Sequence, residues 1–114
     1  MKKEKKVKNL KGVVDILHSN LTKKEKVIIE KAEDMSEFHH GYGTWIRNNF
    51  GLWKDSDLAK WFISRGVDHA DDMSGIILDA LHKKCKGEEY TEEDFLEEKA
   101  EYDKHWNSMK TTKE

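Results

Sequence analysis

The chain contains no proline among its 114 residues, and its apolar side chains recur at intervals of three and four positions. Proline breaks helix interiors, so its absence leaves long stretches free to be helical. The spacing places the apolar side chains on one side of each helix, and no segment alternates apolar and polar residues as a strand does. The sequence therefore predicts an all-α protein, a compact bundle of about five short helices plus a C-terminal amphipathic helix.

Helix start and stop signals divide the chain into these six segments. Asn9 precedes the first helix, and Thr22 followed by Glu25 is a capping-box pattern at the start of the second. Three glycines are placed to end helices, because glycine adopts left-handed backbone without steric cost: Gly51, Gly66 and Gly87. The third segment opens near Asp34 or Ser36 and carries an aromatic face of Phe38, Tyr42, Trp45 and Ile46. We expect it to be the central core helix.

Charged residues make up 39 % of the chain and the net charge is −2, but the charge is unevenly spread. Residues 1–8 are rich in lysine and predict a disordered basic arm, residues 9–87 form the helical core domain, and residues 88–114 form an acidic amphipathic helix and tail. Arg47 and Arg65 are the sole arginines. Nucleic-acid binders carry a basic face in their folded part, so nucleic acid is not an expected partner.

Cysteine content and hydropathy predict a cytoplasmic protein. The single Cys85 cannot form a disulfide within the chain, which suits a reducing compartment, and it lies on an apolar helix face as a small buried hydrophobe would. No apolar run approaches the roughly 20 residues that a membrane span needs. The lysine-rich start also lacks the apolar segment of a signal peptide, so we expect no membrane association.

Two stretches carry a more specific pattern: HHGYGTWIRNNFGLW at residues 39–53 and HADDMSGIILDAL at residues 69–81. Together they resemble an uncharacterised family of small bacterial and phage helical domains of unknown function. The resemblance covers about residues 10–86 and leaves out the last helix. It implies the fold boundary and a set of motif residues, but no reaction. The matching residues are His39, Gly43, Ile46, Arg47, Asn48, Gly51, Leu52, Trp53, His69, Asp71, Asp72 and Ser74. Ala70 stands where the family pattern usually has proline, which loosens the turn before Asp71.

The polar motif residues allow two interpretations. On a helical wheel Arg47 lies about 80° from His39, and Gly43 between them leaves a notch that a ligand or another backbone can enter. One hypothesis is a polar cluster that binds a small ligand or hydrolyses it, built from His39, Arg47, Asn48, His69, Asp71 and Asp72. The favoured one is structural: Arg47 pairs with Asp71 or Asp72 and joins the third helix to the fifth.

The sequence predicts no catalytic residue, no metal site and no cofactor. The adjacent His39 and His40 point about 100° apart on a helix, so they do not suit one ion. The order His-Ala-Asp-Asp lacks the contiguous His-Asp pair of helical phosphohydrolases. Ser74 has no strand-turn-helix elbow or oxyanion loop and is expected to cap its helix, as is one of Asp71 and Asp72.

Size and pattern favour a protein-binding module over an enzyme, such as a phage-encoded or mobile-element inhibitor or regulator. The candidate partner contacts are Trp53, Tyr102 and Trp106. Trp53 follows a glycine in a loop and is interpreted as a lid on the core, with a partner's anchor as the alternative. The C-terminal helix can pack along the bundle, form a homodimer or enter a partner's groove. The rival function is a small-ligand binder or hydrolase that uses the polar cluster.

Overall fold

The computed structural model describes residues 7–53 and 56–112, and within them every regular element is a helix. This confirms the all-α prediction. The elements are α1 (Leu10–Asn20), α2 (Lys23–Lys31), the short 3-10 helix η2 (Ser36–Phe38), α3 (Tyr42–Asn49), α4 (Asp57–Ser64), α5 (Ala70–Cys85) and α6 (Glu92–Thr112).

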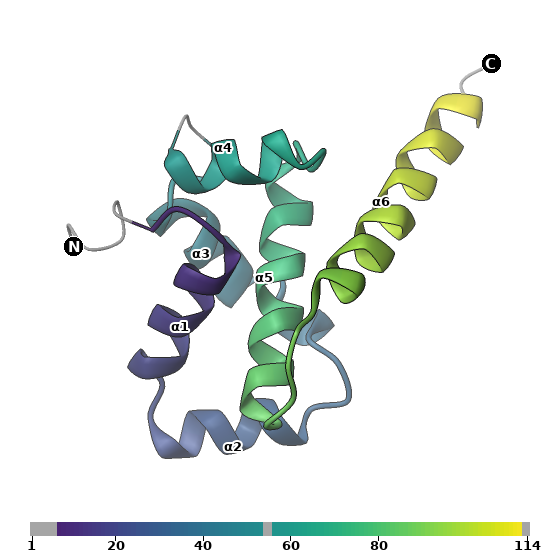
Figure 1. Cartoon of the computed structure of the whole chain (residues 1–114). Coiled ribbons are helices and arrows are strands. Elements are labelled where there is room, and N and C mark those ends of the chain that lie inside the picture. Colours follow the sequence, from purple (N-terminus) through teal and green to yellow (C-terminus); the bar gives the residue numbers. More distant parts are fainter. Residues whose placement is uncertain (1–6, 54–55, 113–114) are drawn as a thin grey trace.

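Helix α5 is the centre of the molecule (Figure 1). Helices α1 and α3 lie along one side of it, α4 and α2 cross near its two ends, and α6 runs along the opposite side and extends outwards. The extensive helix–helix contacts of the described residues all involve α5. Its middle stretch is largely apolar, and Ile76, Ile77 and Leu81 are fully buried. The expectation that residues 34–50 form the central helix is therefore wrong.

The stretch from Ser36 to Asn49 is broken, whereas the apolar spacing predicted one continuous helix. The Asp34 carboxylate accepts hydrogen bonds from the Ser36 backbone N–H and hydroxyl, which closes a local turn before η2. Gly41 and Gly43 then raise the cost of continuing as a helix, and α3 begins only at Tyr42. As a result Trp45 is 45 % exposed and does not belong to the core.

The predicted capping residues form hydrogen bonds at most helix ends. Asn9 accepts from the Gly12 N–H, and Thr22 and Glu25 form the expected capping box. Helix α6 opens with a reciprocal pair, in which the Thr91 hydroxyl accepts from the Asp94 N–H and the Asp94 carboxylate accepts from the Thr91 N–H. The three glycines predicted to end helices all have positive φ: Gly51, Gly66 and Gly87.

The start of α5 differs from the prediction. Ala70 is the first helical residue, and His69 occupies the N-cap position without a side-chain cap bond. Asp71 and Asp72 therefore lie in the first turn, where negative charge suits the helix dipole, and Ser74 lies inside the helix. The prediction that Ser74 and one of these aspartates cap the helix is wrong. Ala70 thus occupies the first helical position, which is the one that proline favours.

Most of the predicted basic arm, residues 1–8, lies outside the described residues, although Val7 is buried in the core. The same is true of residues 113 and 114 in the predicted acidic tail. Helix α6 reaches the core through Phe95, which is 2 % exposed. No described helix has the length and apolarity to cross a membrane.

Candidate functional site

Arg47 of α3 is the centre of a buried polar junction with α5. Its side chain is 7 % exposed. One terminal nitrogen, Nη1, donates to the Ser74 hydroxyl at 2.7 Å, and the other, Nη2, donates to the Thr44 hydroxyl at 2.8 Å. The Ser74 hydroxyl in turn donates to the Asp71 backbone carbonyl at 3.0 Å. The junction therefore ties one turn of α3 to the first turns of α5.

The predicted ion pair is formed with Asp71. Arg47 Nε lies 3.5 Å from Asp71 Oδ1, within ion-pair range. The Nε–H does not point at any acceptor among the described residues, so the contact is a charge–charge interaction and not a directed hydrogen bond. The Asp71 side chain is 62 % exposed and keeps most of its water, whereas the guanidinium has lost nearly all of its own.

Gly43 leaves the predicted notch, but Arg47 itself fills it. A Cβ added at Gly43 would lie 3.3 Å from Arg47 Nη1 and 3.6 Å from a methyl carbon of Leu78. The absent side chain thus makes room for the guanidinium between α3 and α5. A ligand cannot enter the same space unless Arg47 moves.

Trp53 lies at the outer edge of this junction. Its indole Nε1 donates to Asn48 Oδ1 at 3.1 Å, and Arg47 Cζ lies 5.7 Å from the centre of the ring. The side chain is nevertheless 60 % exposed, whereas the preceding Leu52 is buried. The interpretation of Trp53 as a lid on the apolar core is therefore wrong, since its ring covers the guanidinium and faces solvent.

His39 does not join Arg47. It lies in the turn between η2 and α3, and its ring meets that of His40 edge-on at 5.7 Å. In the described ranges no hydrogen bond or ion pair links His39 to Arg47, Asn48 or Asp71. The wheel placed His39 beside Arg47 because it assumed one continuous helix, and the break at Gly41 removes that relation.

His69 and Asp72 turn towards α6 and away from Arg47. The His69 ring stacks on Trp106 at 3.9 Å, and Trp106 Nε1 donates to Asp72 Oδ2 at 2.8 Å. Burial raises the pKa of the Asp72 carboxyl, and the hydrogen bond from Trp106 partly opposes this. A hollow of about 540 Å³ lies beside these groups, bordered also by Tyr102 and Lys99. The six predicted cluster residues thus fall into three separate places.

Tyr102 and Trp106, predicted as partner contacts, lie half-buried between α6 and α5 of the same chain. The Tyr102 hydroxyl fits against Gly75, where an added Cβ would lie only 2.4 Å from it. Within the described part of the chain, no group of three or more histidine, cysteine or acidic side chains is arranged to hold a metal ion.

A half-buried acidic cluster under α6 was not predicted from the sequence. Glu98 shares a hydrogen bond with Asp79 of α5, accepts one from the Tyr90 hydroxyl at 2.5 Å, and contacts the Tyr102 hydroxyl. Burial, followed by the bond with Asp79, raises the pKa of Glu98 to about 9. Two signals pointed here: Asp79 interrupts an apolar run, and Glu98 shares a helix face with Phe95 and Tyr102.

Comparisons with curated proteins and with solved structures gave no match. A family model, described as domain of unknown function DUF6794, matches residues 8–85. The match ends at the last residue of α5, as the resemblance of the two motif stretches implied, and it includes the whole Arg47 junction. It covers well over half of the chain. On this evidence the chain belongs to the DUF6794 family.

Proposed function

We propose that the protein is a cytoplasmic protein-binding module, and that the exposed indole of Trp53 is the anchor of its binding surface. The observation that carries the proposal is that this side chain is 60 % exposed and yet donates a hydrogen bond to Asn48 of its own chain. Tryptophan and arginine dominate the residues that contribute most to protein–protein binding energy. Here the exposed tryptophan follows α3, and its ring lies against the buried guanidinium of Arg47.

The anchor is held in position before any partner arrives. Asn48 fixes the indole N–H, and the guanidinium of Arg47 lies against the ring. Arg47 is itself fixed by Ser74 and Thr44, so the ring is tied to the core through a buried side chain. Immobilising a side chain on binding costs about 0.5–1.5 kcal/mol, and a ring that is already immobile avoids much of this cost.

A second exposed aromatic lies on α3 itself. Trp45 is 45 % exposed, stacks on Tyr42 at 6.0 Å and meets Phe50 edge-on at 6.2 Å. Asn49 donates to the Trp45 carbonyl and Asn48 receives the Trp53 indole N–H, so polar side chains lie next to both tryptophans. An aromatic centre with polar neighbours has the composition of a protein–protein interface.

The contacts around Arg47 favour this function over the small-ligand or hydrolytic one. Both terminal nitrogens of Arg47 are engaged within the chain, and Asp72 receives the Trp106 indole N–H. A ligand would have to displace these bonds, whereas a partner protein can cover the Trp53 ring and leave the junction intact. Of the three predicted partner contacts, Tyr102 and Trp106 are half-buried against their own chain, whereas Trp53 is largely exposed.

The test compares three forms of the protein in the same capture and binding experiment. Wild type, Trp53→Ala and Ile63→Ala are immobilised and exposed to a lysate of the native host, and candidate partners are then purified and titrated calorimetrically. Ile63 on α4 is the matched control, because it is a large apolar side chain that is 51 % exposed. We expect a partner that binds wild type and Ile63→Ala alike and loses at least about 30-fold in affinity to Trp53→Ala.

The proposal fails if the partner binds Trp53→Ala as tightly as wild type. It also fails if the affinity depends on Ile63 and not on Trp53, because the anchor would then lie on α4. Circular dichroism melts of both variants check that neither substitution unfolds the domain.

A further inference from the structure

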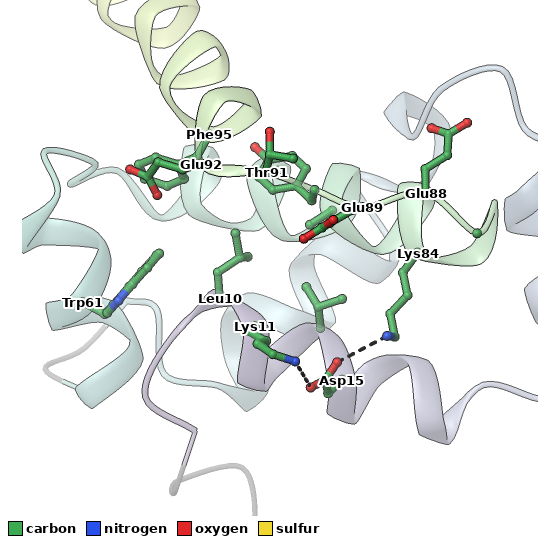
Figure 2. A pocket seen from close by; sticks show the side chains of 14 residues that line it. Leu10, Lys11, Asp15, Trp61, Lys84, Glu88, Glu89, Thr91, Glu92 and Phe95 are labelled. Carbon is green, nitrogen blue, oxygen red and sulfur yellow. Dashed lines mark hydrogen bonds and ion pairs between the residues drawn. The ribbon is translucent and has the colours of Figure 1, made fainter.

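A groove between α1, α4, α5 and the start of α6 has no role in the function proposed above. It has a volume of about 540 Å³ and lies between α1, the Trp61 side chain of α4, the C-terminal half of α5 and residues 87–95. Figure 2 shows Leu10, Trp61 and Phe95 around it, with residues 88–92 running along one edge. It shares no lining residue with the Arg47 junction or with Trp53.

The groove exists because the chain folds back after the family domain ends. Its near walls, from α1, α4 and α5, lie within the family match at residues 8–85. The opposite wall, residues 87–92 and Phe95, lies beyond it. Lys83 holds this wall in place through an ion pair with Asp94 at 3.4 Å. The site is thus a feature of this chain and is not implied by the family domain.

The interior of the groove is apolar and incompletely covered. Val14, Ala80 and Phe95 are buried, while Leu10, Trp61 and Tyr90 pack against the core and remain partly accessible. A volume of this size is in the range of specific ligand pockets, about 300–1,000 Å³. Covering the accessible parts of two aromatic rings and a leucine would remove apolar surface from water and so favour binding of an apolar side chain.

The edges of the groove carry unequal charge. On one edge, Lys11 and Lys84 both contact Asp15, at 3.3 Å and 3.4 Å, so one carboxylate partly neutralises the two lysines (Figure 2). The opposite edge carries Glu88, Glu89 and Glu92.

Cations on the acidic edge do not balance its carboxylates. Arg65 pairs with Glu92, and Lys86 lies 4.0 Å from Glu88, at the limit of an ion pair. In the described part of the chain no ion pair engages Glu89, which is exposed. The acidic edge therefore has carboxylate charge available to a ligand.

We propose that this groove binds a short peptide segment of a partner protein, in which a bulky apolar side chain stands next to lysine or arginine. The apolar side chain enters between Leu10, Trp61 and Tyr90, and the basic residue meets Glu88 and Glu89 at the edge. Burial supplies the affinity, and the carboxylates select the charge of the segment, because like charges at this edge would repel.

The test uses three synthetic twelve-residue peptides labelled with fluorescein. The first combines leucine and phenylalanine with lysines, the second replaces every lysine by glutamate, and the third replaces every apolar residue by serine. Binding to the full chain is measured by fluorescence polarisation and mapped by amide chemical shifts. We expect the first peptide to bind at least about tenfold more tightly than the other two and to shift the amides of Leu10, Ala80 and Tyr90.

Substitutions test whether the peptide binds through the carboxylates of this groove or through the acidic surface in general. Changing Glu88 and Glu89 together to glutamine should weaken the first peptide about fivefold. The matched control changes Glu93 and Glu97 to glutamine, because both are exposed on α6 and neither lines the groove. It should leave the affinity within about twofold of wild type.

Three results would overturn the proposal. The first is equal binding of the lysine and glutamate peptides, and the second is shifts confined to residues outside the groove. The third is self-association that shifts Leu10, Ala80 and Tyr90 without peptide, because the occupant would then be a second copy of this chain. Loss of peptide binding leaves the Trp53 surface unaffected, so this test and that of the proposed function fail independently.

Discussion

Neutralising Asp71 should destabilise the domain, because the buried Arg47 guanidinium would then lack an opposite charge. In an Asp71→Asn variant the Arg47 guanidinium, 7 % exposed, loses the carboxylate that lies 3.5 Å from its Nε. Removing one partner of a fully buried ion pair costs about 3–5 kcal/mol. Asp71 is 62 % exposed, so water screens the pair, and we expect a loss of about 1.5–3 kcal/mol.

This loss converts to a change in melting temperature. Unfolding entropy is about 2.1 cal/mol/K per residue, so for a chain of this length each kcal/mol lowers the midpoint by about 4 °C. Asp71→Asn should therefore melt about 6–12 °C below wild type in a calorimetric scan. The control is Asp57→Asn in the first turn of α4, where the interaction with the helix dipole is worth about 0.3–1 kcal/mol.

A double-mutant cycle with Arg47→Met isolates the charge pair. Methionine removes the guanidinium and leaves an apolar side chain in its place. In that background Asp71→Asn should cost no more than the helix-dipole contribution, so the cycle should show a coupling of at least about 0.5 kcal/mol. If Asp71→Asn costs the same with and without Arg47, the junction is not held by this pair and our account of how α3 meets α5 is wrong.

Three further predictions concern α6 and α5. The pKa of Glu98 is raised from 4.5 to about 9, so between these values the folded chain holds a proton that the unfolded chain has released. Stability should fall as pH rises through this window, by up to about 1.4 kcal/mol per pH unit, and urea titrations of Glu98→Gln should show a shallower fall; an unchanged slope would contradict the assignment. Gly75→Ala should cost about 1–3 kcal/mol in thermal melts because its Cβ would lie 2.4 Å from the Tyr102 hydroxyl oxygen, and adding Tyr102→Phe should recover part of the loss. Burial raises the pKa of the Cys85 thiol, so Ellman's reagent at pH 8 should react with it more slowly in the folded protein than in urea; equal rates would show that the thiol is accessible.

Local signals in the sequence were sufficient for much of the fold. A capping box or a helix-ending glycine depends on residues within a few positions of each other, so Thr22 with Glu25 and Gly51 could be recognised without knowing the tertiary structure. The pairing of Arg47 with Asp71 was also predictable. An arginine on an otherwise inward-facing helix needs an opposite charge, and the acidic start of α5 supplies one.

The remaining errors concern features that depend on the tertiary structure and cannot be recognised from neighbouring residues. Helical periodicity continues through His39 and Gly41, but the structure has a separate 3-10 turn at Ser36–Phe38, and α3 begins only at Tyr42. The position of Asp72 depends on Trp106, which lies 34 residues away on a helix outside the family domain. Which helix is central was also not evident, because a short aromatic face and a long aliphatic one both indicate burial.

The central position of α5 has a consequence for how the chain folds during synthesis. Helices α1 to α4 precede it, and their extensive contacts in the described structure are made with α5. While the ribosome is still adding residues 70–85, the apolar faces of four completed helices have no lasting place to pack. We therefore expect the domain to fold only after the whole of α5 has left the ribosome, with the hydrophobic residues of α1 to α4 exposed until then.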